Sequence, residues 1–279
     1  PTQPRRFYRA GQKMLIDYCL GYTRDIYAPL AARTGGSAEI QAQFEAWESF
    51  LKNSGFFGKR LLMEYYNLCE VPNHGPRGRA LLWPMDILRL DTQEYRRRGI
   101  DGISDWVCQR HYCFPSPFYV WCLVNLYSDP ERTLESFKAD FYPRYFGAAA
   151  GAVRGYMDAL EAVMHARTSP ENLAAVAALG ARLESLPAAD DPLRVRRLQT
   201  LRIHHEYCVL LKRIFLAFIQ GDQATWQALE QPHDEFFTRT HRAELEGDVD
   251  IPLPWGNAWY AFYVHKNKVK ALIDNPFLH

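Results

Sequence analysis

The stretch KRLLMEYYN, residues 59–67, decides the fold class, because a basic entry is followed by an apolar run that ends in polar residues. This pattern is typical of a buried strand of a parallel sheet. The stretches KMLIDYC at residues 13–19 and GISDWVC at residues 102–108 have the same character. Helix-like segments separate the three strands, at residues 37–55 and 83–99. Alternating strands and helices predict parallel pairing, so we expect an α/β fold over residues 1–130.

Caps and spacing support the helical interpretation of these separating segments. Ser37 is suited to cap the first helix and Gly55 to end it, while Gly99 ends the second before the chain enters the third strand. A further helical run follows at residues 116–129. Apolar residues of the first helix recur at helical spacing: Ile40, Phe44, Trp47 and Leu51.

From residue 130 to about residue 247, the sequence predicts only amphipathic helices, so we expect a helical domain over residues 131–279. The charged run Arg194, Arg196 and Arg197 is interpreted as a solvated helix face, and the pair His204–His205 as helix packing or surface. The last 30 residues are too rich in proline and aromatic residues to interpret. Three helices are expected to begin where a capping residue precedes a proline: Asp129–Pro130, Ser169–Pro170 and Asp191–Pro192.

Composition narrows the functional class. The 279 residues carry 33 Lys and Arg against 32 Asp and Glu, a formal charge of +1, so we expect neither a nucleic-acid nor a membrane partner. No apolar stretch is long enough for a membrane span, and the first residues lack the apolar core of a secretory signal. The localisation is therefore periplasmic or extracellular only if the intact protein carries a signal peptide upstream.

Motifs for cofactors and metals do not occur in the sequence. It has no GxGxxG, Walker or HExxH motif, so we predict no cofactor and no metal site. The six cysteines form no CxxC pair, and we interpret them as buried free thiols.

The candidate site lies at the carboxyl ends of the predicted strands, where parallel sheets place their functional residues. Asp17, Glu64 and Asp105 stand there, and glycoside hydrolysis requires two such carboxylates within about 10 Å. We predict Glu64 and Asp17 as the catalytic pair. Structural roles are the alternative, with Asp17 satisfying a buried backbone group or Arg24. The predicted substrate-binding residues are Tyr65, Tyr66, Asp105, Trp106, Arg110, His111 and Arg24.

Four motifs in this order resemble an uncharacterised bacterial glycosidase-like family. They are the strand end Glu64–Tyr66, the turn Gly99–Gly102, the step Leu126–Pro130 and the run Asp140–Ala149, and the resemblance covers roughly residues 13–167. The family is a domain of unknown function that often follows an α-glucuronidase-type N-terminal domain. It is related to hexosaminidase and α-glucuronidase barrels. The step YPRYFGAAA, residues 142–150, is its most specific part, and we interpret it as a helix-to-helix joint.

The resemblance implies a (β/α)8 barrel, of which the three strands are the last three, followed by a helical region. We then expect a truncated chain whose first strand is an exposed edge. Met14, Ile16 and Leu62 should lie on an apolar surface that the other barrel half or a second copy covers.

The leading interpretation is the C-terminal portion of a glycoside-hydrolase-like protein that acts on O-glycosidic bonds of a carbohydrate. Whether the chain by itself is an enzyme stays open. The alternatives are a non-catalytic carbohydrate-binding protein and a helical interaction or scaffold protein.

Overall fold

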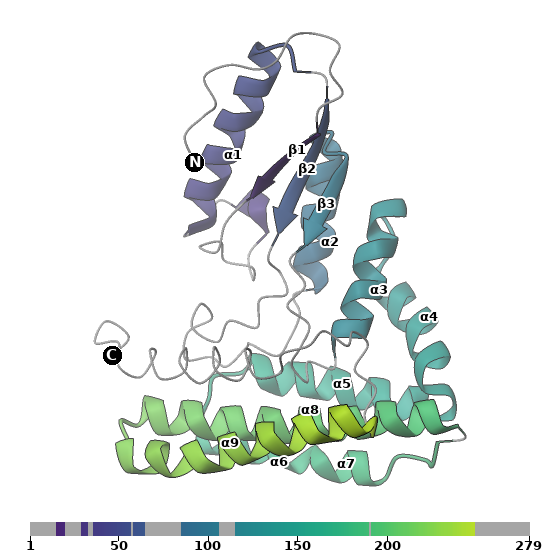
Figure 1. Cartoon of the computed structure of the whole chain (residues 1–279), viewed down its shortest axis with the longest axis vertical. Helices are drawn as coiled ribbons and strands as arrows, with labels where there is room; N and C mark the ends of the chain where they lie inside the picture. The colour runs from purple at the N-terminus through teal and green to yellow at the C-terminus, as the bar shows by residue number, and fades with distance from the viewer. Residues whose placement is uncertain are drawn as a thin grey trace. The chain divides into compact units, whose positions relative to one another are not determined.

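The computed structural model describes residues 15–19, 29–32, 36–56, 58–64, 85–105, 115–189 and 191–248 (Figure 1). The chain divides into two compact units. The first comprises Pro1–Leu68, Pro84–Cys108 and Cys122–Arg132, and the second comprises Cys69–Trp83, Gln109–Trp121 and Thr133–His279. No helix of the described part is long and apolar enough to cross a membrane.

The first unit is built around a small open sheet. Its three strands are β1 (Leu15–Cys19), β2 (Lys59–Glu64) and β3 (Gly102–Asp105), in the order β1-β2-β3 with both pairs parallel. The predicted order of three parallel strands is therefore confirmed. The expected strand residues 13–14, 65–67 and 106–108 lie outside the described residues. The helical elements of this unit are η1 (Leu30–Ala32), α1 (Gly36–Asn53) and α2 (Met85–Arg97), while α3 (Pro115–Ser128) is divided between the two units.

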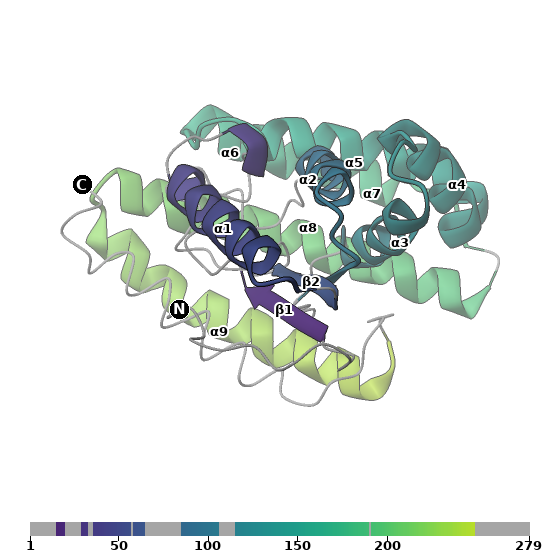
Figure 2. The same ribbon diagram turned by 90° about the horizontal axis from the view of Figure 1, so that it is seen from above.

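One face of the sheet packs against α1 and α2. Figure 2 shows both helices on the same side of the strands. Tyr18 of β1 lies against the rings of Phe44 and Trp47 in α1, with centroid distances of 5.7 and 4.7 Å. The apolar stripe predicted for α1 is confirmed as core, and it meets Leu62, Tyr95 and the partly buried Ile16 and Ile103. Burial of this stripe supplies the hydrophobic stabilisation of the unit.

The expectation of an apolar surface around Ile16 and Leu62 is wrong. Leu62 is fully buried, and Ile16 packs against the helix-covered core. Side chains alternate between the two faces of a strand, so the residue before Ile16 points away from the helices. That residue, Leu15, is 61% exposed. Met14, the third member of the expected surface, lies outside the described residues.

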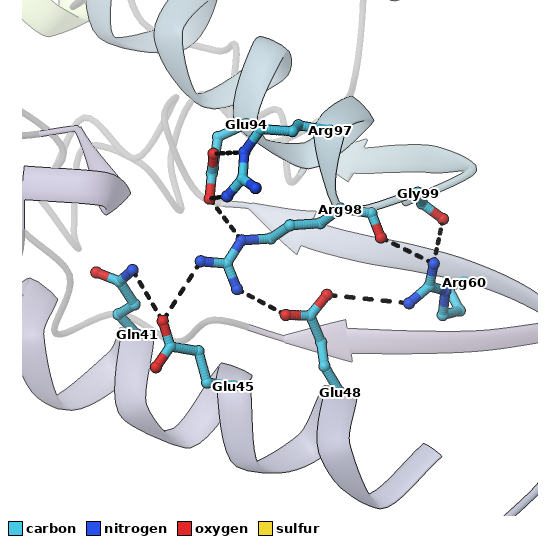
Figure 3. Close-up of polar contacts among 8 residues, drawn as sticks. All are labelled: Gln41, Glu45, Glu48, Arg60, Glu94, Arg97, Arg98 and Gly99. Carbon is cyan, nitrogen blue, oxygen red and sulfur yellow. Dashed lines mark hydrogen bonds and ion pairs between the residues drawn. The ribbon is translucent and has the colours of Figure 1, made fainter. Parts of the chain in front are cut away.

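A charge network joins α1, α2 and β2 near the amino-terminal ends of the strands (Figure 3). The guanidinium of Arg98, just after α2, donates to Glu94 and to Glu48 of α1, both at 2.6 Å. Arg60 of β2 donates to the backbone oxygens of Arg98 and Gly99 at 2.9 and 2.5 Å. The Arg98 side chain is only 11% exposed, so the network is worth more than a surface ion pair.

The second unit contains only helices among its described residues, as predicted. The elements are α4 (Leu134–Phe146), η3 (Gly147–Ala149), α5 (Ala150–His165), α6 (Pro170–Ala178), α7 (Gly180–Glu184), α8 (Pro192–Ile219) and α9 (Gln223–Glu246). The helices α8 and α9 pack along each other, as both views show (Figures 1 and 2).

Two of the three predicted helix starts are confirmed. Ser169 accepts a hydrogen bond from the backbone N–H of Asn172 at the start of α6, and Asp191 accepts one from Arg194 at the start of α8. The start predicted at Pro130 is wrong, because the chain makes a turn there. The helix begins at Leu134 instead, where the hydroxyl of Thr133 accepts from the backbone N–H of Ser136 at 3.2 Å.

The YFGAAA step is a joint between two helices, as its interpretation predicted. Gly147 ends α4 with φ +57°, and a single turn of 3-10 helix leads into α5. Two arginines of α8 close over this joint. The guanidinium of Arg197 donates to the carbonyl of Tyr145 at 2.9 Å and lies 3.8 Å from the centroid of its ring. The interpretation of this run as a solvated face is therefore wrong for Arg197.

Replacing Gly147 by alanine should destabilise the chain. The substitution puts a side chain at positive φ, and its Cβ would lie 2.7 Å from the guanidinium of Arg194. We expect a loss of about 1–3 kcal/mol in the free energy of unfolding, measured by denaturant titration. The control is Gly151→Ala, an α5 position where a Cβ meets open space. That change should be neutral or stabilising by up to ~1 kcal/mol. Equal effects of the two substitutions would contradict this account of the joint.

Candidate functional site

The three strands end at one edge of the sheet because they are parallel. Glu64 and Asp105, the last residues of β2 and β3, are direct register partners. The structure therefore brings these two predicted site positions together in the backbone, while the side chain of Asp105 lies outside the described residues. The other predicted substrate-binding residues are outside them as well: Arg24, Tyr65, Tyr66, Trp106, Arg110 and His111.

Glu64 points toward the helices. It is only 2% exposed, and its Oε1 accepts a hydrogen bond from the hydroxyl of Tyr95 in α2, which is itself fully buried. It shares this face with Leu62, two residues earlier on the strand, whose side chain belongs to the core. A carboxylate beneath a covering helix, bonded to a buried hydroxyl, has the position of a structural group.

Asp17 points to the opposite face. Its register partner is Leu61, and aligned residues of neighbouring parallel strands lie on the same face. Leu61 and Glu64 are three residues apart, so they lie on opposite faces of β2 and Asp17 lies opposite Glu64. The expectation that Asp17 and Glu64 form one catalytic pair is therefore wrong: the sheet separates them. Asp17 itself is exposed, and partial desolvation raises the pKa of its carboxyl group.

No described helix of the first unit packs on the face that carries Asp17, and we call this face the open face. Its residues form two aligned rows across the strands. Asp17, Leu61 and Gly102 make one row, and Cys19, Met63 and Ser104 make the row nearer the carboxyl edge. The open face thus combines one carboxylate, a hydroxyl and a thiol with apolar side chains. Such a surface can accept hydrogen bonds from a ligand and pack against its apolar parts.

The cysteine interpretation holds for two of the three described thiols. Cys122 and Cys208 are buried, whereas Cys19 is exposed on the open face, which corrects the expectation of burial there. Cys69, Cys108 and Cys113 lie outside the described residues. The sequence contained a signal for this position: side chains alternate along a strand, so Cys19, two residues after Asp17, lies on the same face as Asp17.

The second unit contains a buried polar cluster that sequence analysis did not identify as such. His204 and His205 of α8 are buried, in keeping with a packing role. Lys212, two turns further along α8, is fully buried, and its Nζ donates to the carbonyls of Met164 and Ala166 at 3.2 and 3.3 Å. This ammonium therefore satisfies carbonyls at the C-terminal end of α5.

Neither a metal site nor a known relative identifies the site. No group of three or more His, Cys, Asp or Glu side chains able to hold a metal ion occurs in the part of the chain that the structure describes. No family model matches the chain, and comparisons with curated proteins and with solved structures give no match either. The geometry of the two faces of the sheet is therefore what indicates a function.

If Glu64 is structural, removal of the Tyr95 hydroxyl should lower stability. Tyr95→Phe takes the donated hydrogen bond from a buried carboxylate, and we expect a loss of about 1–3 kcal/mol in the free energy of unfolding.

The matched control is Tyr127→Phe in α3. The Tyr127 hydroxyl is buried without a hydrogen-bond partner among the described residues, and burial raises the pKa of Tyr127 to about 12. Its removal should leave stability unchanged or slightly increased. Equal losses in the two variants, measured by urea titration, would contradict the structural role of the Tyr95–Glu64 bond.

Proposed function

We propose that the chain is part of a glycoside-hydrolase-like protein and that the open face of β1–β3, at its carboxyl edge, contacts a carbohydrate. The observation that carries this proposal is the one-sided packing of the sheet. The helices α1 and α2 cover one face, and the other presents Asp17 without a described covering helix from the same unit.

The arrangement of the strands supports this proposal. Successive parallel strands joined by helices on one face have the construction of a (β/α)8 barrel, in which the uncovered face points inward. In such a barrel, Cys19, Met63 and Ser104 would form the inward row nearest the carboxyl edge, and Asp17 would lie in the row beneath. The barrel itself is part of the proposal, as is the resemblance to the glycosidase-like family.

Asp17 is the carboxylate that we assign to the carbohydrate. A carboxylate accepts strong hydrogen bonds from sugar hydroxyls. Glu64 has no part in this assignment. Any hydrolysis would need a second carboxylate on the side of Asp17, since two acids must flank the same bond.

The separation of Asp17 and Glu64 also favours a second candidate function, carbohydrate binding without hydrolysis. One accessible carboxylate beside apolar side chains is sufficient for binding a sugar, whereas cleavage requires two acids.

Carbohydrate binding and turnover should depend on Asp17. The probes are a panel of neutral and acidic oligosaccharides for calorimetric binding and the matching nitrophenyl glycosides for turnover. We expect Asp17→Asn to weaken binding about tenfold or more, the usual effect of losing a hydrogen bond to a charged group.

The matched control is Asp101→Asn. Asp101 lies at the opposite end of the sheet, where Lys59 donates to it at 2.6 Å, so its loss should leave binding unchanged. If the wild type cleaves a glycoside and Asp17→Asn does not, the result supports hydrolysis. If the wild type binds an oligosaccharide but cleaves none of the glycosides, the result supports carbohydrate binding without hydrolysis. Failure of the folded protein to bind any member of the panel, or equal effects of both substitutions, would contradict the proposal.

A further inference from the structure

His205 lies where its own helix in the second unit meets three others, α5, α6 and α7. It lies on α8 and is 9% exposed. Its Nδ1 is 3.0 Å from the hydroxyl of Tyr156 in α5, and the two rings meet edge to face with centroids 5.8 Å apart. The backbone of Ala177 in α6 also lies near the ring and favours its protonated form. The Nε2 of His205 lies 3.0 Å from the place that a Cβ at Gly180, the first residue of α7, would occupy.

These contacts fix the ring in its neutral form. The Tyr156 hydroxyl has no other acceptor among the described residues, so the hydrogen of the neutral ring belongs on Nε2. Nδ1 is then the acceptor, and the Tyr156 hydroxyl donates to it. Tyr156 is fully buried, and among the described residues its hydroxyl has no second hydrogen-bond partner.

Protonation of the ring disrupts this arrangement. A hydrogen on Nδ1 would face the hydroxyl of Tyr156, whose own hydrogen must then turn into a buried environment without an acceptor. The charged ring would also lose the hydration that it has in water. Burial accordingly lowers the pKa of His205, against smaller opposing contributions from Ala177 and Glu206.

Few charged groups near the ring oppose this effect. From α5 the titratable neighbour is Tyr156, and α7 contributes Arg182, whose guanidinium is directed toward the carbonyl of Gly155 at 3.5 Å. On α8 itself the neighbours are His204, Glu206 and the buried thiol Cys208, whose pKa burial raises. Among these charged neighbours only Glu206 favours the charged ring, and it is exposed and paired with Arg239 of α9.

We propose that His205 is a pH-sensitive latch, which holds the break between α6 and α7 against α8 at neutral pH and releases it on acidification. The break lies at Leu179, between two short helices, and it is the place where the ring meets their backbone. Opening of the break would hydrate the ring and let it take up a proton.

The direction of the pH dependence follows from linkage. His205 binds a proton less readily in the closed form than in an open or unfolded form. The latch therefore contributes its full stabilisation above the ordinary histidine pKa of about 6.5. It loses this stabilisation progressively as the pH falls toward the lower pKa of the closed form.

Hydrogen exchange of the full chain tests the latch. When the pH is lowered from about 7.5 to about 5, the equilibrium constant for opening of the α6–α7 amides should increase. This constant is obtained from the exchange rates after correction for intrinsic exchange. At low pH the increase in this opening constant approaches a limit, which is roughly tenfold for each pH unit by which the closed form lowers the pKa of His205. The amides of α9 serve as the internal reference and should change little.

The variant His205→Gln keeps a polar side chain at this position but cannot titrate, so its α6–α7 exchange should be independent of pH over the same range. A pH dependence that persists in this variant, or that spreads evenly over α5, α8 and α9 in the wild type, overturns the proposal. If the variant does not fold, the wild-type ring is titrated by NMR. A ring that titrates below 6.5 together with the α6–α7 amide signals supports the latch. Titration at or above 6.5, or without a change in those signals, overturns it.

Discussion

Side chains of a parallel sheet alternate between two faces, and this constraint determines which residues of the first unit can meet. Tyr18 and Leu62 share a face, so α1 and α2 pack there and form the core. Glu64 falls on the same face by its position in β2, and burial then requires the partner that Tyr95 supplies. Asp17 falls on the other face for the same reason. The chemistry available to a ligand is therefore fixed by the packing of the helices.

The two ends of the sheet differ in their chemistry. At the amino-terminal end, Arg98 connects α1 with the end of α2, and Arg60 ties that segment to β2. Hydrogen bonds from Arg97 and Arg98 hold the pKa of Glu94 below its usual value, which keeps this network charged near neutral pH. In repeated βα units this end contributes stability, whereas the carboxyl end carries function. The proposed carbohydrate site at the carboxyl edge would thus leave the network free to hold the unit together.

In the second unit, charged and polar side chains organise the packing of the helices. Arg197 stacks on Tyr145 at the joint of α4 and α5, and Lys212 satisfies carbonyls at the other end of α5. Both residues belong to α8, so this long helix secures α5 at its two ends. His205 lies between them and contacts α5 through Tyr156. The latch therefore lies where the unit already depends on buried polar contacts.

Local sequence determined the order of the elements, the parallel strands, the helix starts at Ser169 and Asp191 and the joint at Gly147, because caps, spacing and glycine act within a few residues. It failed where distant segments decide the outcome. The predicted pairing of Asp17 with Glu64 was wrong because the register between β1 and β2 determines which side chains of the two strands lie on the same face of the sheet. The packing roles of Arg197 and Lys212 were not recognised because their partners lie 52 and 48 residues away. Such contacts leave no periodic pattern in the sequence, and only the tertiary structure determined them.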